Sequence, residues 1–117
     1  MLTLEKKMAM PWIYLIAAGL FEIGWPVGLK LSQTPGRLGL GLAVAVVCLA
    51  ASGGLLWLAQ KTIPIGTAYA VWTGIGAAGT FLVGVLFYGD SANAMRLVSV
   101  GLIVAGIVGL KLAHGSG

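Results

Sequence analysis

The sequence predicts an all-α membrane protein with four transmembrane helices per subunit, and three observations lead to this fold class. Hydrophobic residues make up 59% of the 117-residue chain, and charged residues make up only 9%. The mean hydropathy is +1.02, which exceeds what the core of a soluble domain requires. The few charges separate four apolar stretches, each long enough to cross a bilayer core of about 30 Å. The expected spans are residues 11–31, 38–58, 63–88 and 94–112.

The charges and the single cysteine exclude several classes of function. The net charge is +4, but the basic residues are scattered between apolar runs, so nucleic acid is not an expected partner. Cys48 stands alone, which excludes a disulfide framework and a thiolate metal site. The chain has no metal-ligand cluster, no phosphate-binding glycine loop and no nucleophile beside a base. We therefore expect neither an enzyme nor a bound metal or cofactor, and His114 is expected to be a solvated tail residue.

The first span contains an acid at a depth where acids are rare. Residues 1–10 are expected to form a polar tail, and the run 11–31 is too long for the hydrophobic part of a signal peptide. Glu22 is twelfth in this run of 21 residues, which places it near the bilayer midplane. An acid there costs at least about 2.5 kcal/mol, so it is by default a functional group. The alternative is a structural ion pair, but no Lys or Arg lies at matching depth in any span.

The residues that follow Glu22 shape the same helix. Trp25 comes three positions later, so it projects from nearly the same face and can point its indole N–H toward the acid. Pro26 has no N–H to donate to the Glu22 carbonyl, so a kink or a loosened turn is expected. Gly24 and Gly28 have the small-xxx-small spacing that lets another helix approach closely.

The second span, residues 38–58, carries no charge and a single hydroxyl, that of Ser52. A lone serine in a membrane helix most often donates to a carbonyl of its own helix. The turn before this span contains Pro35 and Gly36. Lys30 and Arg37 flank that turn, where long side chains can reach the lipid headgroups.

The third span, residues 63–88, combines polar-tipped aromatic residues with glycines. Tyr69, Trp72, Gly76 and Gly79 fall at i, i+3, i+7 and i+10, so they share one helical face. Together with Gly74, these glycines permit close packing and also weaken the helix enough to act as a hinge. We therefore expect a helix hinge or packing role for four residues: Pro26, Gly74, Gly76 and Gly79.

The fourth span, residues 94–112, is predicted to mediate dimerisation. Arg96 and Lys111 lie at its ends, where their side chains can extend to the membrane surface. Three glycines offer positions for helix association: Gly101, Gly106 and Gly109. Residues 113–117 are expected to form a short C-terminal tail.

Four spans put both termini on one side of the membrane, and the basic residues then show almost no bias between the two sides. Four fall on the terminal side and three on the other: Lys6, Lys7, Lys61 and Lys111 against Lys30, Arg37 and Arg96. Because such bias sets orientation, this chain is expected to insert both ways. Secondary transporters are often built from inverted repeats, and two oppositely oriented copies would supply that symmetry here.

Several motifs carry a resemblance to a known family. The segment Phe21–Trp25 and the long segment Lys61–Ala77 resemble the small multidrug resistance family of proton-coupled cation exporters, and specifically its guanidinium exporter subtype. Ser91–Arg96 and Gly109–Leu112 are also similar to that subtype. The resemblance covers nearly the whole chain after Met10. Pro26 departs from the pattern, which has an alanine after the tryptophan.

The resemblance implies an antiparallel, dual-topology homodimer in the cell inner membrane that exchanges protons for guanidinium ions. Glu22 would bind both substrate and proton, and four residues would line its site: Trp25, Ser52, Tyr69 and Trp72. The chemistry of these residues agrees with this role. A carboxylate can hold a planar guanidinium through two parallel hydrogen bonds, and aromatic faces attract cations.

Two other functions remain open at this point. One is export of larger quaternary ammonium or polyaromatic cations, for which Trp25 and Ser52 offer more hydrogen bonds than such substrates need. The other is a helix bundle that transports nothing and stabilises a membrane partner, with Glu22 as a docking acid. Replacing Glu22 with Gln separates the second from a transporter, because docking can survive on hydrogen bonds and proton exchange cannot.

Overall fold

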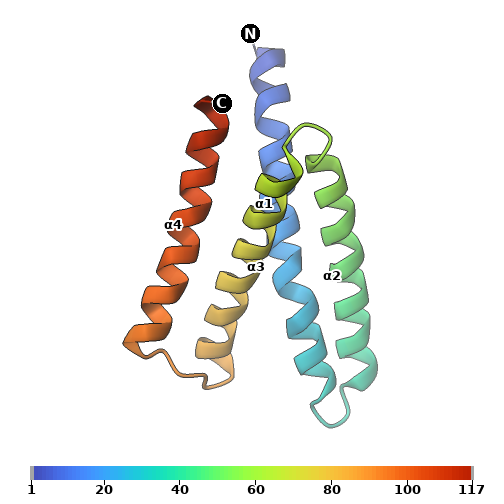
Figure 1. Ribbon diagram of the computed structural model, residues 1–117. Coiled ribbons are helices and arrows are strands. Elements are labelled where there is room, and N and C mark those ends of the chain that lie inside the picture. The colour runs from blue at the N-terminus through green and yellow to red at the C-terminus, as the bar shows by residue number, and fades with distance from the viewer. Residues whose placement is uncertain (1, 117) are drawn as a thin grey trace.

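The computed structural model describes the backbone of residues 2–116 and the side chains of residues 9–114, and this part of the chain forms four helices (Figure 1). They are α1 (Leu2–Ser32), α2 (Leu38–Ala59), α3 (Ile65–Phe87) and α4 (Ala94–Ser116). Each includes a stretch long and apolar enough to cross a membrane: Ala9–Ser32, Leu38–Ala59, Ile65–Phe87 and Ala94–His114. The predicted all-α fold with four spans is therefore confirmed.

The observed helices differ from the expected spans mainly at the ends of the chain. α1 begins at Leu2, so most of the expected N-terminal tail, residues 1–10, is helical. The Met, Leu, Glu and Lys residues of that segment are all good helix formers. α4 likewise continues to Ser116, through most of the expected C-terminal tail. α3 starts later than predicted because Pro64, with a ψ of 142°, caps it in an extended conformation.

The three connections lie at two opposite ends of the bundle. The termini and the α2–α3 connection lie at one end, and the α1–α2 and α3–α4 connections lie at the other (Figure 1). Gly36 and Gly89 make the turns at this second end with φ of 79° and 72°. Glycine adopts these left-handed values without the steric cost that a side chain would add.

The backbones of α1 and α2 approach closely because glycines line their interface. A Cβ atom added at Gly28 would lie 2.6 Å from the backbone nitrogen of Ala45. A Cβ atom at Gly24 would overlap the Cys48 sulfur, and one at Gly41 would overlap the backbone of Ser32. The close approach that the spacing of Gly24 and Gly28 predicts is thus found, with α2 as the partner helix.

α1 also packs against α3, and a small core lies at the end of the bundle that holds the α2–α3 connection. A Cβ atom at Gly19 would lie 2.7 Å from side-chain carbons of Ile75, so α3 lies close to α1 here. The core cluster consists of buried residues from α1, α2, α3 and the connection between the last two: Trp12, Leu15, Ala59, Ile63, Ala68 and Val71.

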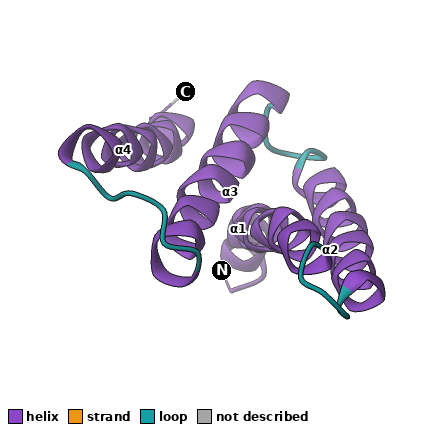
Figure 2. Cartoon of the chain, turned by 90° about the horizontal axis from the view of Figure 1, so that it is seen from below, coloured by secondary structure: helices purple, strands orange, loops and turns teal. Residues whose placement is uncertain are grey.

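α4 lies beyond α3, apart from the group formed by the other three helices (Figure 2). Its backbone approaches only that of α3, at a position where a Cβ atom on Gly74 would lie 2.8 Å from Ile107. Near the C-terminal end, the Lys111 ammonium lies 4.8 Å from the centre of the Trp12 ring, and the His114 ring lies 5.3 Å from it. No residue in the most apolar window of α4 is buried.

Candidate functional site

Glu22 is half-buried near the middle of the membrane-spanning part of α1. Gly76 of α3 makes room for it, because a Cβ atom at Gly76 would lie 2.5 Å from the Glu22 Cγ atom. Gly79, about one turn later, receives the Ile23 side chain in the same way. The predicted face of α3 that contains Gly76 and Gly79 therefore packs on α1 next to Glu22. Gly74 lies against α4 instead.

The Glu22 carboxylate lies within hydrogen-bond distance of one side chain on α1 and one on α2, and the α2 side chain in turn bonds to α3. The Trp25 indole N–H, one turn later on α1, donates to Glu22 Oε1. The Ser52 hydroxyl of α2 lies 3.4 Å from Glu22 Oε2. The Ser52 oxygen in turn accepts a 2.8 Å hydrogen bond from the Trp72 indole N–H of α3. Four of the five side chains predicted for the substrate site therefore meet in one network.

Ser52 is fully buried and has a choice of two acceptors. Its hydroxyl lies 2.8 Å from the carbonyl oxygen of Ala18, closer than it lies to Glu22. A hydroxyl has one proton, so Ser52 donates to only one of them at a time. Both acceptors belong to α1, so the expectation that Ser52 bonds to its own helix is wrong. Ala18 contributes only a backbone atom, which no side-chain pattern in the sequence could indicate.

Tyr69 is the predicted site residue that the structure leaves outside the hydrogen-bond network. Its side chain is 56% exposed. Its ring lies 5.5 Å from the Trp72 ring, at an interplanar angle of 55°, within the range of favourable aromatic pairs. Tyr69 therefore extends the aromatic surface of Trp72 toward the outside of the helix bundle.

The remaining predicted residues lie away from the carboxylate. α1 continues as a helix through Pro26 to Ser32, although Pro26 cannot donate a hydrogen bond to the Glu22 carbonyl. Gly101, Gly106 and Gly109 of α4 have no atom within 4 Å of an added Cβ. These α4 glycines therefore make no close contact with the other helices of the chain that the structure describes.

The arrangement around Glu22 suits a small flat cation with several N–H groups. An ionised carboxylate offers about four acceptor positions. Trp25 occupies one on Oε1, and Ser52 occupies at most one on Oε2. The remaining positions can accept two parallel N–H donors, as in an arginine–carboxylate pair. The described residues contain no group of three or more His, Cys, Asp or Glu side chains able to hold a metal ion.

Comparison with known proteins gives one family and a consistent set of relatives. The family model described as Small Multidrug Resistance protein matches residues 10–103. A protein of Yersinia pseudotuberculosis named guanidinium exporter is 53% identical over 104 residues, which cover 89% of this chain and 99% of that protein. Guanidinium exporters of Salmonella typhimurium and Escherichia coli K12 are each 51% identical, over 89% of this chain and 98% of theirs.

Proposed function

This chain belongs to the small multidrug resistance family, and we propose that it exports guanidinium ions from the cell in exchange for protons. The observation that carries the proposal is the hydrogen-bonded carboxylate of Glu22 in the middle of a membrane span. The printed names of relatives at 51–53% identity support guanidinium as the substrate. The chain is accordingly a multi-pass membrane transporter and not an enzyme.

Guanidinium binds as the partner of the Glu22 carboxylate. Its planar N–H groups donate to the acceptor positions that Trp25 and Ser52 leave unused. The indole and phenol rings of Trp25, Trp72 and Tyr69 supply faces that attract a cation stripped of water. The Trp25 hydrogen bond orients the carboxylate through Oε1, and the Ser52 hydroxyl can donate to Oε2 when it is not bonded to the Ala18 carbonyl.

Exchange follows from competition for one carboxyl group. A cation beside a carboxyl group favours release of its proton, so one carboxyl group cannot hold a proton and guanidinium at the same time. Glu22 therefore carries a proton in one direction and guanidinium in the other. Coupling also requires that the empty, ionised site does not readily change its exposure from one side of the membrane to the other. The desolvation cost of an unpaired charge supports this condition.

The test of this mechanism replaces Glu22 with Gln. This variant keeps the size of the side chain and some hydrogen bonding, but it can neither ionise nor hold a transferable proton. In proteoliposomes with an imposed proton gradient, we expect Glu22→Gln to abolish guanidinium uptake and substrate-induced proton release. Glu5→Gln alters the other glutamate of the chain, which lies outside the spanning part of α1, and should behave like the unaltered protein.

Two results would contradict the proposal. The mechanism fails if Glu22→Gln still drives guanidinium uphill on a proton gradient. The substrate assignment fails if the unaltered protein exchanges protons for tetraalkylammonium in preference to guanidinium and phenylguanidinium, each tested at the same concentration.

We further propose that the working unit is a homodimer of oppositely oriented copies. The near balance of basic residues between the two sides supports dual insertion. The open glycines of α4 and the exposed Tyr69 support a partner surface. In this arrangement α4 pairs with α4 of the second copy, and the second copy covers the aromatic side of the site.

Accessibility tags placed at the C-terminus test the orientation. Labelling of intact cells should find the tag on both sides of the membrane in comparable amounts. Adding two arginines to the turn at 33–36 should fix one orientation, abolish transport alone, and restore transport with an oppositely biased variant. Finding every tag on one side would exclude the antiparallel dimer.

A further inference from the structure

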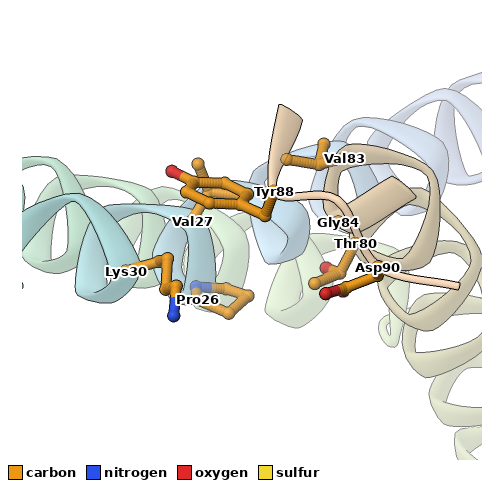
Figure 3. Close-up of a pocket in the computed structure, with 8 residues that line it drawn as sticks. All are labelled: Pro26, Val27, Lys30, Thr80, Val83, Gly84, Tyr88 and Asp90. Atoms are coloured by element: carbon orange, nitrogen blue, oxygen red, sulfur yellow. The ribbon is translucent and has the colours of Figure 1, made fainter. Parts of the chain in front are cut away.

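A pocket lies at the end of the bundle where the α1–α2 and α3–α4 connections run (Figure 3). Its volume is about 310 Å³, and it is lined by α1, by α3 and by the first residues of the α3–α4 connection. Pro26 is its deepest α1 residue, one turn beyond Glu22, and Glu22 itself does not line it. The pocket is therefore distinct from the carboxylate site.

The two charged residues of this pocket have opposite signs and lie near the ends of the membrane-spanning stretches of α1 and α3. Lys30 belongs to the last turn of α1, and Asp90 lies in the α3–α4 connection. The two side chains lie on opposite sides of Pro26 in the close-up view (Figure 3). The Lys30 ammonium is 5.9 Å from the centre of the Tyr88 ring, a distance at which a cation is attracted to an aromatic face.

The fold holds Asp90 at the pocket through two glycines. Gly89 turns the chain with a φ of 72°, and the Asp90 N–H then donates to the Gly84 carbonyl at 3.0 Å. The Asp90 carboxylate lies so close to Gly84 that a Cβ atom there would overlap Oδ2. The loop is therefore folded back so that the acid rests on α3 at the pocket.

The deeper part of the pocket is mostly apolar. Pro26 precedes Lys30 by four residues, which places it roughly 6 Å deeper along the helix. Val27 and Val83 line the same region, and Thr80 adds one hydroxyl. The pocket thus combines a positive and a negative group at the surface with an apolar interior, which is the polarity of a zwitterionic phospholipid.

We propose that this pocket binds phosphatidylethanolamine. The Lys30 ammonium pairs with the lipid phosphate, the Asp90 carboxylate accepts hydrogen bonds from the primary ammonium of the lipid, and the start of an acyl chain lies along Pro26 and Val83. A free guanidinium ion is a poorer occupant because Lys30 repels it. An anionic phospholipid is poorer because Asp90 repels it, and a quaternary ammonium headgroup has no N–H to donate.

Photo-crosslinking tests the proposal without relying on transport. The protein is reconstituted in phosphatidylcholine vesicles with a small fraction of phosphatidylethanolamine that carries a diazirine near the headgroup. We expect label on residues 26–30 and 80–90, displaced by phosphatidylethanolamine more effectively than by phosphatidylglycerol. Asp90→Asn and Lys30→Met should each lower this labelling about threefold, the scale of an exposed ion pair.

Matched variants separate specific binding from general effects. Asp90→Glu keeps the charge and should retain most of the label. Lys61→Met removes a lysine outside this pocket, whose ammonium lies 4.3 Å from the centre of the Trp57 ring. This variant should be labelled as strongly as the unaltered protein. Helix content measured by circular dichroism identifies any variant that fails to fold, and the Asp90→Glu comparison then decides the role of the acid.

Two outcomes would overturn the proposal. Label spread over all four helices and unchanged by Asp90→Asn would mean that the probe reports boundary lipid only. A carbodiimide cross-link between Lys30 of one copy and Asp90 of another would mean that a second copy fills the pocket.

Discussion

The helix group α1–α3 and the outlying α4 are both rich in glycine, but only the group places some of its glycines against a neighbouring helix. In the group, Gly19, Gly28 and Gly76 each lie so close to a neighbouring helix that an added Cβ would come within 2.5–2.7 Å of its atoms. In α4, the space around Gly101 and Gly106 is open. Glycine therefore lies at close helix contacts at several positions of the group, although Gly39 of α2 is open, and at none of these positions in α4.

Ser52 of the group and Ser99 of α4 show a similar difference. Ser52 of α2 is buried and bonds to groups on α1 and α3. Ser99 of α4 is exposed and donates to the Met95 carbonyl of its own helix at 2.8 Å. Polar and small residues in a membrane helix thus form interhelical contacts only where another helix packs against them. Within the described part of this chain, the backbone of α4 approaches only that of α3.

The largest effect is expected from filling a closed contact in the group. Gly28→Leu places a side chain against the backbone of α2 and should destabilise the α1–α2 pair by about 3 kcal/mol, as overpacking does. Gly39→Leu adds the same side chain where nothing lies within 4 Å. In a titration with sodium dodecyl sulfate, only Gly28→Leu should unfold at a lower detergent fraction than the unaltered protein. Equal stability of the two would mean that α1 and α2 can separate without cost.

A smaller effect is expected from the buried serine. Ser52→Ala removes the acceptor of the Trp72 N–H and one donor beside Glu22, so guanidinium affinity should fall about tenfold. Ser99→Ala removes only a bond within α4 and should leave affinity unchanged. Isothermal titration calorimetry measures both constants. If the two variants bind guanidinium alike, Ser52 has no part in substrate binding.

The smallest effect is expected from filling the open glycines of α4. Gly106→Leu should leave the helices of a single subunit intact and weaken dimerisation about fivefold, the scale of a small-residue helix contact. Energy transfer between labelled copies in detergent measures association, and circular dichroism measures helix content. A loss of helix content with unchanged association would show that α4 is needed within the subunit instead.

Much of the site could be predicted from the sequence because it is local to one helix. The i, i+3 spacing of Glu22 and Trp25 places the two side chains on one face at any helix orientation, and the structure joins them by a hydrogen bond. The spacing of Gly76 and Gly79 likewise predicts a smooth surface for packing, which α1 occupies. Such relations follow from 3.6 residues per turn alone.

Contacts between helices could not be predicted in this way. α2 is apolar all round apart from Ser52, so hydrophobic periodicity does not indicate which of its faces meets α1. The general tendency of a lone membrane serine to bond to its own helix therefore gave a wrong expectation for Ser52. Tyr69 shares a helical face with Trp72, but its side chain remains exposed while Trp72 donates a hydrogen bond to Ser52.

The sequence by itself determined the four spans, the acid at the bilayer midplane and the tryptophan one turn from it, because apolar length and helical periodicity are properties of the chain. Only the tertiary structure decided that Ser52 meets Ala18 and Glu22 across 34 and 30 positions of sequence, and that Asp90 folds back onto Gly84. Those contacts depend on how rigid helices are rotated and how loops turn at their ends. In a chain so uniformly apolar, close packing at glycines fixes how each helix is rotated about its axis. The hydropathy of the sequence does not predict these rotations.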